Sequence, residues 1–267
     1  MNTKEIKRWD HYQKLLSENQ SVRQNEFTTI LNILKPKNGE VIIEIGPGNG
    51  FVTKAIADKI GYGGKIYAAE IKNNNFSRLI ESNDKGLPII PIFLDRTRQN
   101  FLPKEFENFF DANVSLATLH HFDNTIEQTG EKGRISFLRE SKRVLKHGGR
   151  IVICDVQFGT ETQKYLYAIN DPLHYSPFGH PHDFFTKERI YELMQQEGFF
   201  NISISIVKTP WVFKDESHAR SFWHSYLNAK CTEDETFEIV RTFLGAKKVG
   251  NHFETGWSIM CITAIKK

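Results

Sequence analysis

The fold of this 267-residue chain is decided by one stretch, Val41-Ile42-Ile43-Glu44-Ile45-Gly46-Pro47-Gly48-Asn49-Gly50. Residues 41–45 form an apolar run interrupted only by Glu44, a pattern typical of a strand buried on both faces. Glycine follows at 46, 48 and 50, and the apolar residues of 51–60 can share one face of a helix. Strand, glycine turn and helix form the first half of a nucleotide-binding βαβ unit, in which glycine allows close approach of the backbone to a ligand.

The spacing of the glycines narrows the class of ligand. A dinucleotide site reads G-x-G-x-x-G and would need glycine at position 51, where this chain has Phe51. Residues 65–71 read as a second buried strand, which carries Glu70 twenty residues after Gly50. A carboxylate at the carboxyl end of that strand can accept hydrogen bonds from both ribose hydroxyls of a nucleoside, although it could also simply face water. The pattern acidic-x-G-x-G-x-G resembles the first motif of class I S-adenosylmethionine (SAM)-dependent methyltransferases.

A second motif supports the resemblance. The string Leu-x-Glu-x-x-Arg-Val-Leu-Lys-x-Gly-Gly spans 138–149 and precedes an apolar strand at 151–155. It resembles the ubiquinone/menaquinone-biosynthesis type of small-molecule methyltransferase, with His147 at the usual proline. The resemblance implies an α/β fold: a Rossmann-like seven-stranded sheet, mostly parallel with an antiparallel last strand, and helices on both faces. The expected strands are 41–45, 65–71, 88–94, 111–119, 151–155, 202–207 and 257–265, and the prolines of 88–94 suit a sheet edge.

The resemblance also implies a cofactor site for SAM, with S-adenosylhomocysteine (SAH) as product. Glu44 would help to hold the ammonium group, Glu70 the ribose and Asp95 the adenine amino group. Asp95 could instead pair with Arg96 or be solvated. The strand that ends near Leu119 should lie beside the sulfonium. The cofactor-binding residues expected on this basis are Glu44, Gly46, Pro47, Gly48, Gly50, Glu70, Asp95 and Leu119.

Histidines supply the candidate for proton transfer. His120 directly follows the fourth expected strand, and imidazole suits proton transfer near neutral pH. It is therefore the candidate base or substrate contact, whereas many enzymes of the resembling family carry histidines here that are not bases. A second group, His174 and His180-Pro181-His182, lacks the H-x-x-x-H spacing or a cysteine partner, so no metal site is predicted.

Segments that exceed the minimal fold suggest the domain organisation. Residues 1–24 are expected to form an N-terminal helical cover, 25–208 the SAM-binding core, 209–256 a helical lid and 257–267 the last core strand. The core contains an insertion at 156–185. This insertion and 209–256 are rich in aromatic residues and histidine, which predicts a substrate pocket; the alternative is that these rings bury one another.

The amino-acid composition argues against nucleic acid and membranes as partners. The net charge is only +3, and neither a dense basic run nor an apolar run of membrane-spanning length occurs, so neither nucleic acid nor membrane insertion is expected. Three cysteines without a C-x-x-C pair and a polar first segment favour a reduced, cytoplasmic protein. The oligomeric state stays open.

The predicted function is methyl transfer from SAM to a small, aromatic or amphipathic metabolite. The rRNA adenine dimethyltransferases share the pattern of 44–48, but they carry an Asn/Asp-x-Pro-aromatic motif where this chain has Leu-His-His-Phe at 119–122. Methylation of a protein or RNA and a non-catalytic SAM-binding scaffold remain the alternatives.

Overall fold

The computed structural model describes residues 3–71, 77, 80, 86–95, 101–123, 131–169, 182–226 and 229–267, with side chains from residue 11 onward. The chain divides into two compact units. The large unit comprises Thr29–Asp155, Phe185–Ile206 and Met260–Lys267, and the small unit comprises Met1–Thr28, Val156–Phe184 and Val207–Ile259. No helix within the described ranges is both long and apolar enough to cross a membrane.

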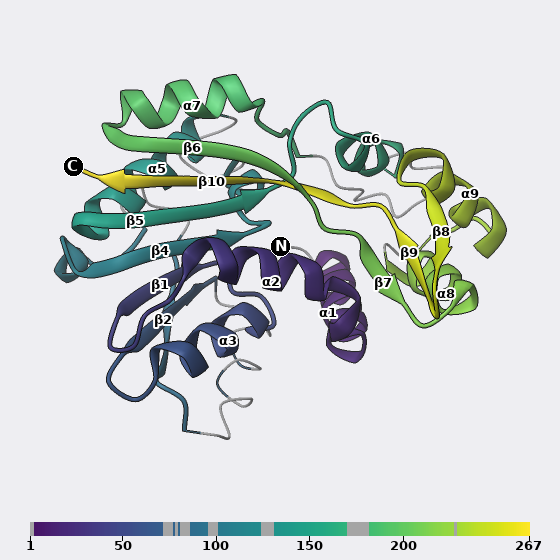
Figure 1. Ribbon diagram of the computed structural model, residues 1–267, viewed down its shortest axis with the longest axis horizontal. Helices are drawn as coiled ribbons and strands as arrows, with labels where there is room; N and C mark the ends of the chain where they lie inside the picture. The colour runs from purple at the N-terminus through teal and green to yellow at the C-terminus, as the bar shows by residue number, and fades with distance from the viewer. Residues whose placement is uncertain are drawn as a thin grey trace. The chain divides into compact units, whose positions relative to one another are not determined.

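The large unit is built on a seven-stranded sheet with the order β3-β2-β1-β4-β5-β10-β6 (Figure 1). Strands β1 to β5 pair in parallel, whereas β10 runs antiparallel to β5. This topology confirms the predicted fold, including the antiparallel last strand. The strands are β1 Val41–Ile45, β2 Lys65–Glu70, β3 Ile89–Phe93, β4 Phe110–Leu116, β5 Leu145–Asp155, β6 Phe199–Lys208 and β10 Ser258–Lys266.

The strand order indicates at which edge of the sheet a ligand binds. Strand β1 lies between β2 and β4, so the order reverses there, and ligands of such sheets bind beyond the carboxyl ends of the strands at this reversal. Strand β3 forms an edge, as its prolines predicted. Pro91 pairs with Ala68 of β2, and its missing N–H is tolerated because β3 is the outermost strand of this sheet among the residues that the structure describes.

Alternation along β1 explains why helices cover both faces. Ile43 and Ile45 belong to a buried cluster with Phe137 of α5 (Glu131–Val144) and Met194 of α7 (Lys187–Gln196). Successive strand residues point to opposite faces, so Glu44 points to the other side. There it meets α3 (Phe51–Ile60), the helix predicted to follow the glycine turn.

The end of β4 differs from the prediction, which continued the strand to Leu119. Strand β4 ends at Leu116, because Ala117 adopts a left-handed backbone (φ 51°) and its N–H donates to the carbonyl of Cys154 at 2.7 Å. The 3-10 helix η3 then begins (Leu119–Asp123). Leu119 and His120 therefore lie on a helical turn beyond the strand.

The small unit combines helices with a three-stranded antiparallel sheet in the order β7-β9-β8. Segment 209–256 is therefore not purely helical as predicted, because its strands of three or four residues are too short to show alternation. The elements of the small unit are α1 Thr3–Glu18, η1 Gln20–Arg23, the start of α2 (Gln24–Leu34), α6 Glu161–Ala168, β7 Trp211–Phe213, α8 Glu216–Tyr226, α9 Glu233–Phe243, β8 Ala246–Val249 and β9 His252–Thr255. A further 3-10 turn, η2 (Lys104–Phe106), belongs to the large unit.

Aromatic rings form the core of the small unit. Trp211 and Trp223 stack with centroids 4.8 Å apart and planes 9° from parallel, and the ring of Trp257 lies 4.6 Å from that of Trp211. Tyr165 and Tyr226 pack edge-on against Trp223. All five side chains are buried, so these rings bury one another. His174, Tyr175, Phe178 and His180, which the pocket prediction also named, lie outside the described residues.

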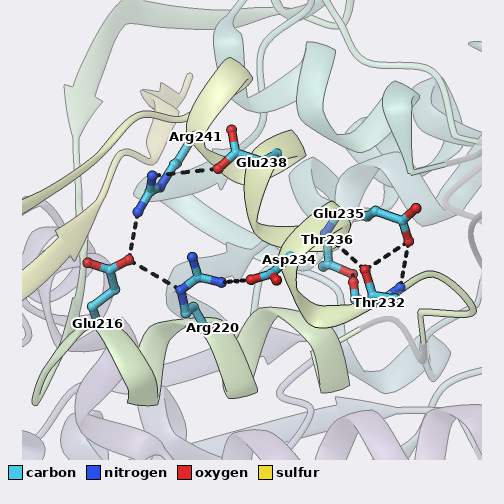
Figure 2. A network of polar contacts seen from close by, with 8 residues as sticks. All are labelled: Glu216, Arg220, Thr232, Asp234, Glu235, Thr236, Glu238 and Arg241. Atoms are coloured by element: carbon cyan, nitrogen blue, oxygen red, sulfur yellow. Dashed lines mark hydrogen bonds and ion pairs between the residues drawn. The ribbon is translucent and has the colours of Figure 1, made fainter.

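Ion pairs join α8 to α9 across the surface of the small unit (Figure 2). Arg220 lies between Glu216 (3.2 Å) and Asp234 (2.6 Å), and Arg241 reaches the same oxygen of Glu216 at 2.6 Å. Both guanidinium groups also lie over the ring of Phe237, 4.7 and 5.1 Å from its centroid. The ring and the two arginines thus hold the helix pair together by packing as well as by charge.

Candidate active site

The glycine turn after β1 has the backbone that the motif requires. Gly46, Gly48 and Gly50 have φ angles of +73°, +53° and +74°, a region that residues with a Cβ rarely adopt. A Cβ at Gly46 would overlap the side chain of Thr118. The N–H of Gly50 donates to the carbonyl of Pro47 at 2.9 Å, which closes the turn directly before α3.

Glu70 lies against this turn. It is the last residue of β2 and is 8% exposed. One carboxylate oxygen accepts from the backbone N–H of Gly48 at 3.2 Å, and the other accepts from the N–H of Ile71 at 2.8 Å. The structure therefore brings together two elements that the sequence separates by twenty-two residues, the glycine turn and the acidic end of the second strand.

Glu44 is a buried acid at the same edge. It is 2% exposed, and the hydroxyl of Thr53, in the first turn of α3, donates to its carboxylate at 2.5 Å. Burial raises the pKa of Glu44 to about 7; the Thr53 hydrogen bond opposes this rise and the charge of Glu70 adds to it. Near neutral pH the group is therefore close to half ionised, and a nearby cation would favour its charged form.

Thr118 connects the turn to the segment after β4. Its hydroxyl donates to the carbonyls of Leu116 at 3.0 Å and Gly46 at 3.3 Å. Neither Thr118 nor Thr53 was predicted from the sequence. A threonine three places after a glycine or two places before a histidine forms no recognisable motif, so only the tertiary contacts reveal them.

His120 is held by Asp155, the last residue of β5. Its backbone N–H donates to one oxygen of Asp155 at 3.1 Å, and its ring Nδ1 lies 2.7 Å from the other oxygen. Both side chains are only 5% exposed. The ring of His121 lies 4.0 Å from that of His120. The sequence marked Asp155 only as the end of a strand, and its partnership with His120 was not predicted.

The remaining predicted residues lie at the same edge of the large unit. Leu119 is buried in the apolar cluster that contains Phe101 and Phe122. Asp95 comes two residues after β3, whose neighbour β2 ends in Glu70, and it is partly exposed. Among the described residues no three His, Cys, Asp or Glu side chains are grouped as metal ligands, and His174 and His180 of the histidine-rich segment lie outside that part of the chain.

This arrangement fits SAM, which carries an ammonium, a sulfonium, a ribose diol and an adenine. Two carboxylates, Glu44 and Glu70, provide acceptors for a cation and a diol, and both lie beside a turn whose backbone has no Cβ at three positions. All of these groups come from the large unit.

Comparison with known proteins identifies a methyltransferase domain in this part of the chain. Residues 43–153 match the family described as "Methyltransferase domain", a span that runs from β1 to β5. A search of curated proteins found no match. Among solved structures, a SAM-dependent methyltransferase of Aquifex aeolicus is 15% identical with a TM-score of 0.55, and the alignment covers 95% of this chain and 97% of that one.

Two further structures have named acceptors. A geranyl diphosphate methyltransferase in complex with SAM is 12% identical with a TM-score of 0.59, over 95% of this chain and 89% of that one. Phosphoethanolamine N-methyltransferase 2 of Haemonchus contortus, in complex with SAM, is 17% identical with a TM-score of 0.58, over 97% of this chain and 56% of that one. At these identities the structures show the fold, and the matching domain supplies the activity. The protein is a SAM-dependent methyltransferase, whose methyltransferase domain spans residues 43–153.

Proposed function

We propose that the enzyme transfers the methyl group of SAM to a small metabolite, aromatic or amphipathic, as do the quinone-biosynthesis methyltransferases that its second motif resembles. One observation carries the proposal: the segment after β4 is a 3-10 turn with a buried histidine, His120, bonded to Asp155. The rRNA adenine dimethyltransferases carry an Asn/Asp-x-Pro-aromatic motif here that grips the amine of the flipped base, and this chain lacks it. This turn instead offers a group that can accept a proton.

The cofactor is assigned to the glycine turn and the acids around it. Gly46, Pro47, Gly48 and Gly50 would approach the methionyl part, and Glu44 would hold the ammonium directly or through water. Glu70 would bind the ribose hydroxyls, which agrees with its place beside Gly48. In the same assignment Asp95 would bind the adenine and Leu119 would lie near the sulfonium.

Chemistry at this site requires alignment and the loss of one proton. SAM supplies an electrophilic methyl carbon with a neutral thioether as leaving group. Placing an acceptor in line with that carbon can contribute roughly 7 to 11 kcal/mol. A hydroxyl or ammonium acceptor must also lose a proton, and His120 is the residue to which we assign this role.

Several observations support a small acceptor. The net charge of +3 is too low to favour nucleic acid. The two compared enzymes with named acceptors act on geranyl diphosphate and phosphoethanolamine, which are small molecules. We also propose a reducing, cytoplasmic location, which three cysteines without a C-x-x-C pair favour.

The test is release of SAH from SAM in the presence of separate acceptor classes. A panel of phenols, quinols, amines and amphipathic phosphates should contain a substrate, and rRNA, tRNA and protein extracts should give only background. The isosteric variant Glu70→Gln serves as the matched control, because it should bind SAM weakly in the same assay. Turnover confined to RNA or protein would refute the small-molecule assignment, and SAM binding without turnover on any acceptor would favour a scaffold.

A further inference from the structure

The carboxylate of Asp155 contacts His120 twice, once at the backbone N–H and once at the ring. We propose that Asp155 is a positioning residue: it holds His120 in the tautomer with the proton on Nδ1, so that Nε2 is the atom that takes the proton of the methyl acceptor. The catalytic part of this proposal rests on the proposed function, whereas the positioning part concerns two residues of the chain alone.

The two contacts determine the tautomer. An ionised carboxylate can only accept hydrogen bonds, so at a separation of 2.7 Å from an Asp155 oxygen the Nδ1 atom of His120 must be the donor. A neutral imidazole that carries its proton on Nδ1 has its lone pair on Nε2. The second oxygen of Asp155 accepts from the backbone N–H of His120 at 3.1 Å, so ring and backbone are held by one side chain.

The surrounding backbone reinforces this geometry. Ala117 adopts its left-handed conformation directly before the turn, and its N–H donates to the carbonyl of Cys154, the neighbour of Asp155. The end of β5 therefore contacts the segment after β4 through both its backbone and its side chain. A left-handed backbone is unfavourable for a residue with a Cβ, and such strain is kept where neighbouring contacts determine the conformation.

The charge of Asp155 also favours transfer of the proton from the methyl acceptor to Nε2 of His120. When the acceptor's O–H or N–H bond breaks, its proton passes to Nε2 and the acceptor's electron pair forms the new bond to the methyl carbon. The electron pair of the broken carbon–sulfur bond remains on sulfur. For a neutral hydroxyl or amine acceptor, the positive charge that was on the sulfonium thus ends on the imidazolium of His120, beside the carboxylate of Asp155 and the ring of His121. The carboxylate stabilises that charge, as in other carboxylate–histidine pairs.

The competing explanation is that Asp155 only caps the 3-10 turn through the backbone N–H of His120. Asp155→Asn separates the two roles. An amide has one accepting oxygen, so it cannot accept from the ring and from the backbone through two different atoms. If the oxygen stays with the backbone, the amide nitrogen faces Nδ1 and favours the opposite tautomer, with the proton on Nε2.

The experiment reads the tautomer directly. Long-range proton–nitrogen NMR correlations report which ring nitrogens of each histidine are protonated, and His120→Gln assigns the signals of His120. We expect a protonated Nδ1 and an unprotonated Nε2 in the wild type, and the reverse in Asp155→Asn. Asp111→Asn is the matched control: Asp111 also accepts a backbone N–H and a side-chain donor, Val41 and Lys146, but lies at the start of β4.

Kinetics give the second readout. Once an acceptor has been identified, Asp155→Asn should lower kcat by about 10²- to 10⁴-fold, which is the usual contribution of a general base. The Kd for SAM should not change. Asp111→Asn should leave both unchanged. A wild-type His120 with its proton on Nε2 would overturn the proposal, and so would an Asp155→Asn enzyme with wild-type kcat. The wild-type spectrum decides the positioning role even if the variant fails to fold. Absence of turnover with every small acceptor would instead refute the proposed function. The NMR spectrum would then still show whether Asp155 positions the ring of His120.

Discussion

Glu44→Gln tests whether a buried carboxyl makes this protein sensitive to pH. The change removes one titratable group from the end of β1 and keeps an oxygen that can accept the hydrogen bond from Thr53. Burial raises the pKa of Glu44 from 4.5 to about 7. In the unfolded chain the carboxyl is hydrated, and its pKa returns to the ordinary value.

The size and the sign of the effect follow from these two values. Each pKa unit of difference between the folded and unfolded states is worth about 1.4 kcal/mol, so the full effect is roughly 3 kcal/mol. The folded protein holds the proton more tightly. Glu44 therefore stabilises the fold fully at pH values below about 4.5, and this stabilisation is lost as the pH rises through 7.

The assay compares wild type and Glu44→Gln by urea unfolding from pH 5 to pH 8. Subtracting the two free energies of unfolding cancels the other titrating groups, and the wild-type advantage should fall by about 2.5 kcal/mol over this range. Parallel stability curves would refute the argument from burial. SAM provides a second readout, because its ammonium favours the ionised carboxylate: affinity for the wild type should weaken below pH 7, whereas the weaker affinity of the variant should stay flat.

Three other changes test the site and the core. Glu70→Ala should weaken SAM binding in calorimetry by about 1 to 3 kcal/mol through lost charge-assisted hydrogen bonds, and an unchanged Kd would contradict the ribose assignment. Gly46→Ala should lower the free energy of unfolding by about 1 to 3 kcal/mol more than the control Gly39→Ala. Both positions have positive φ, but only at Gly46 would the new Cβ overlap Thr118. Equal losses of stability in the two variants would argue against the overlap. In native protein a thiol reagent should modify Cys231 first, because the other two cysteines are buried, and Cys231→Ser should abolish the fast phase.

Local patterns were sufficient for most of the large unit. The glycine turn, the buried strands on either side of it and the helix at Phe51–Ile60 lie where the sequence predicted them, because burial on both faces and glycine spacing leave signals within ten residues. Thr186, a residue type that favours helix N-termini, caps α7 and accepts from the N–H of Arg189 at 3.1 Å.

Predictions failed where a distant contact overrides a local pattern. The apolar run from Val114 to Leu119 reads as one strand, yet the bond from Ala117 to Cys154 turns the chain after Leu116. The aromatic residues of 209–256 predicted a substrate pocket, with rings that bury one another as the alternative. Packing among Trp211, Trp223 and their neighbours shows that those rings form a core.

The sequence by itself determined the fold class, the glycine turn and the two acids that flank it, because hydrophobic periodicity and backbone freedom are properties of neighbouring residues. Only the tertiary structure decided which groups act on one another. The bond between His120 and Asp155 joins residues 35 positions apart, and the raised pKa of Glu44 depends on burial beneath α3. Likewise, the three segments that exceed the minimal fold form one unit only because their apolar faces cover each other. Long-range pairing and the burial of individual polar groups are set by the packed chain, and a single sequence carries no local sign of them.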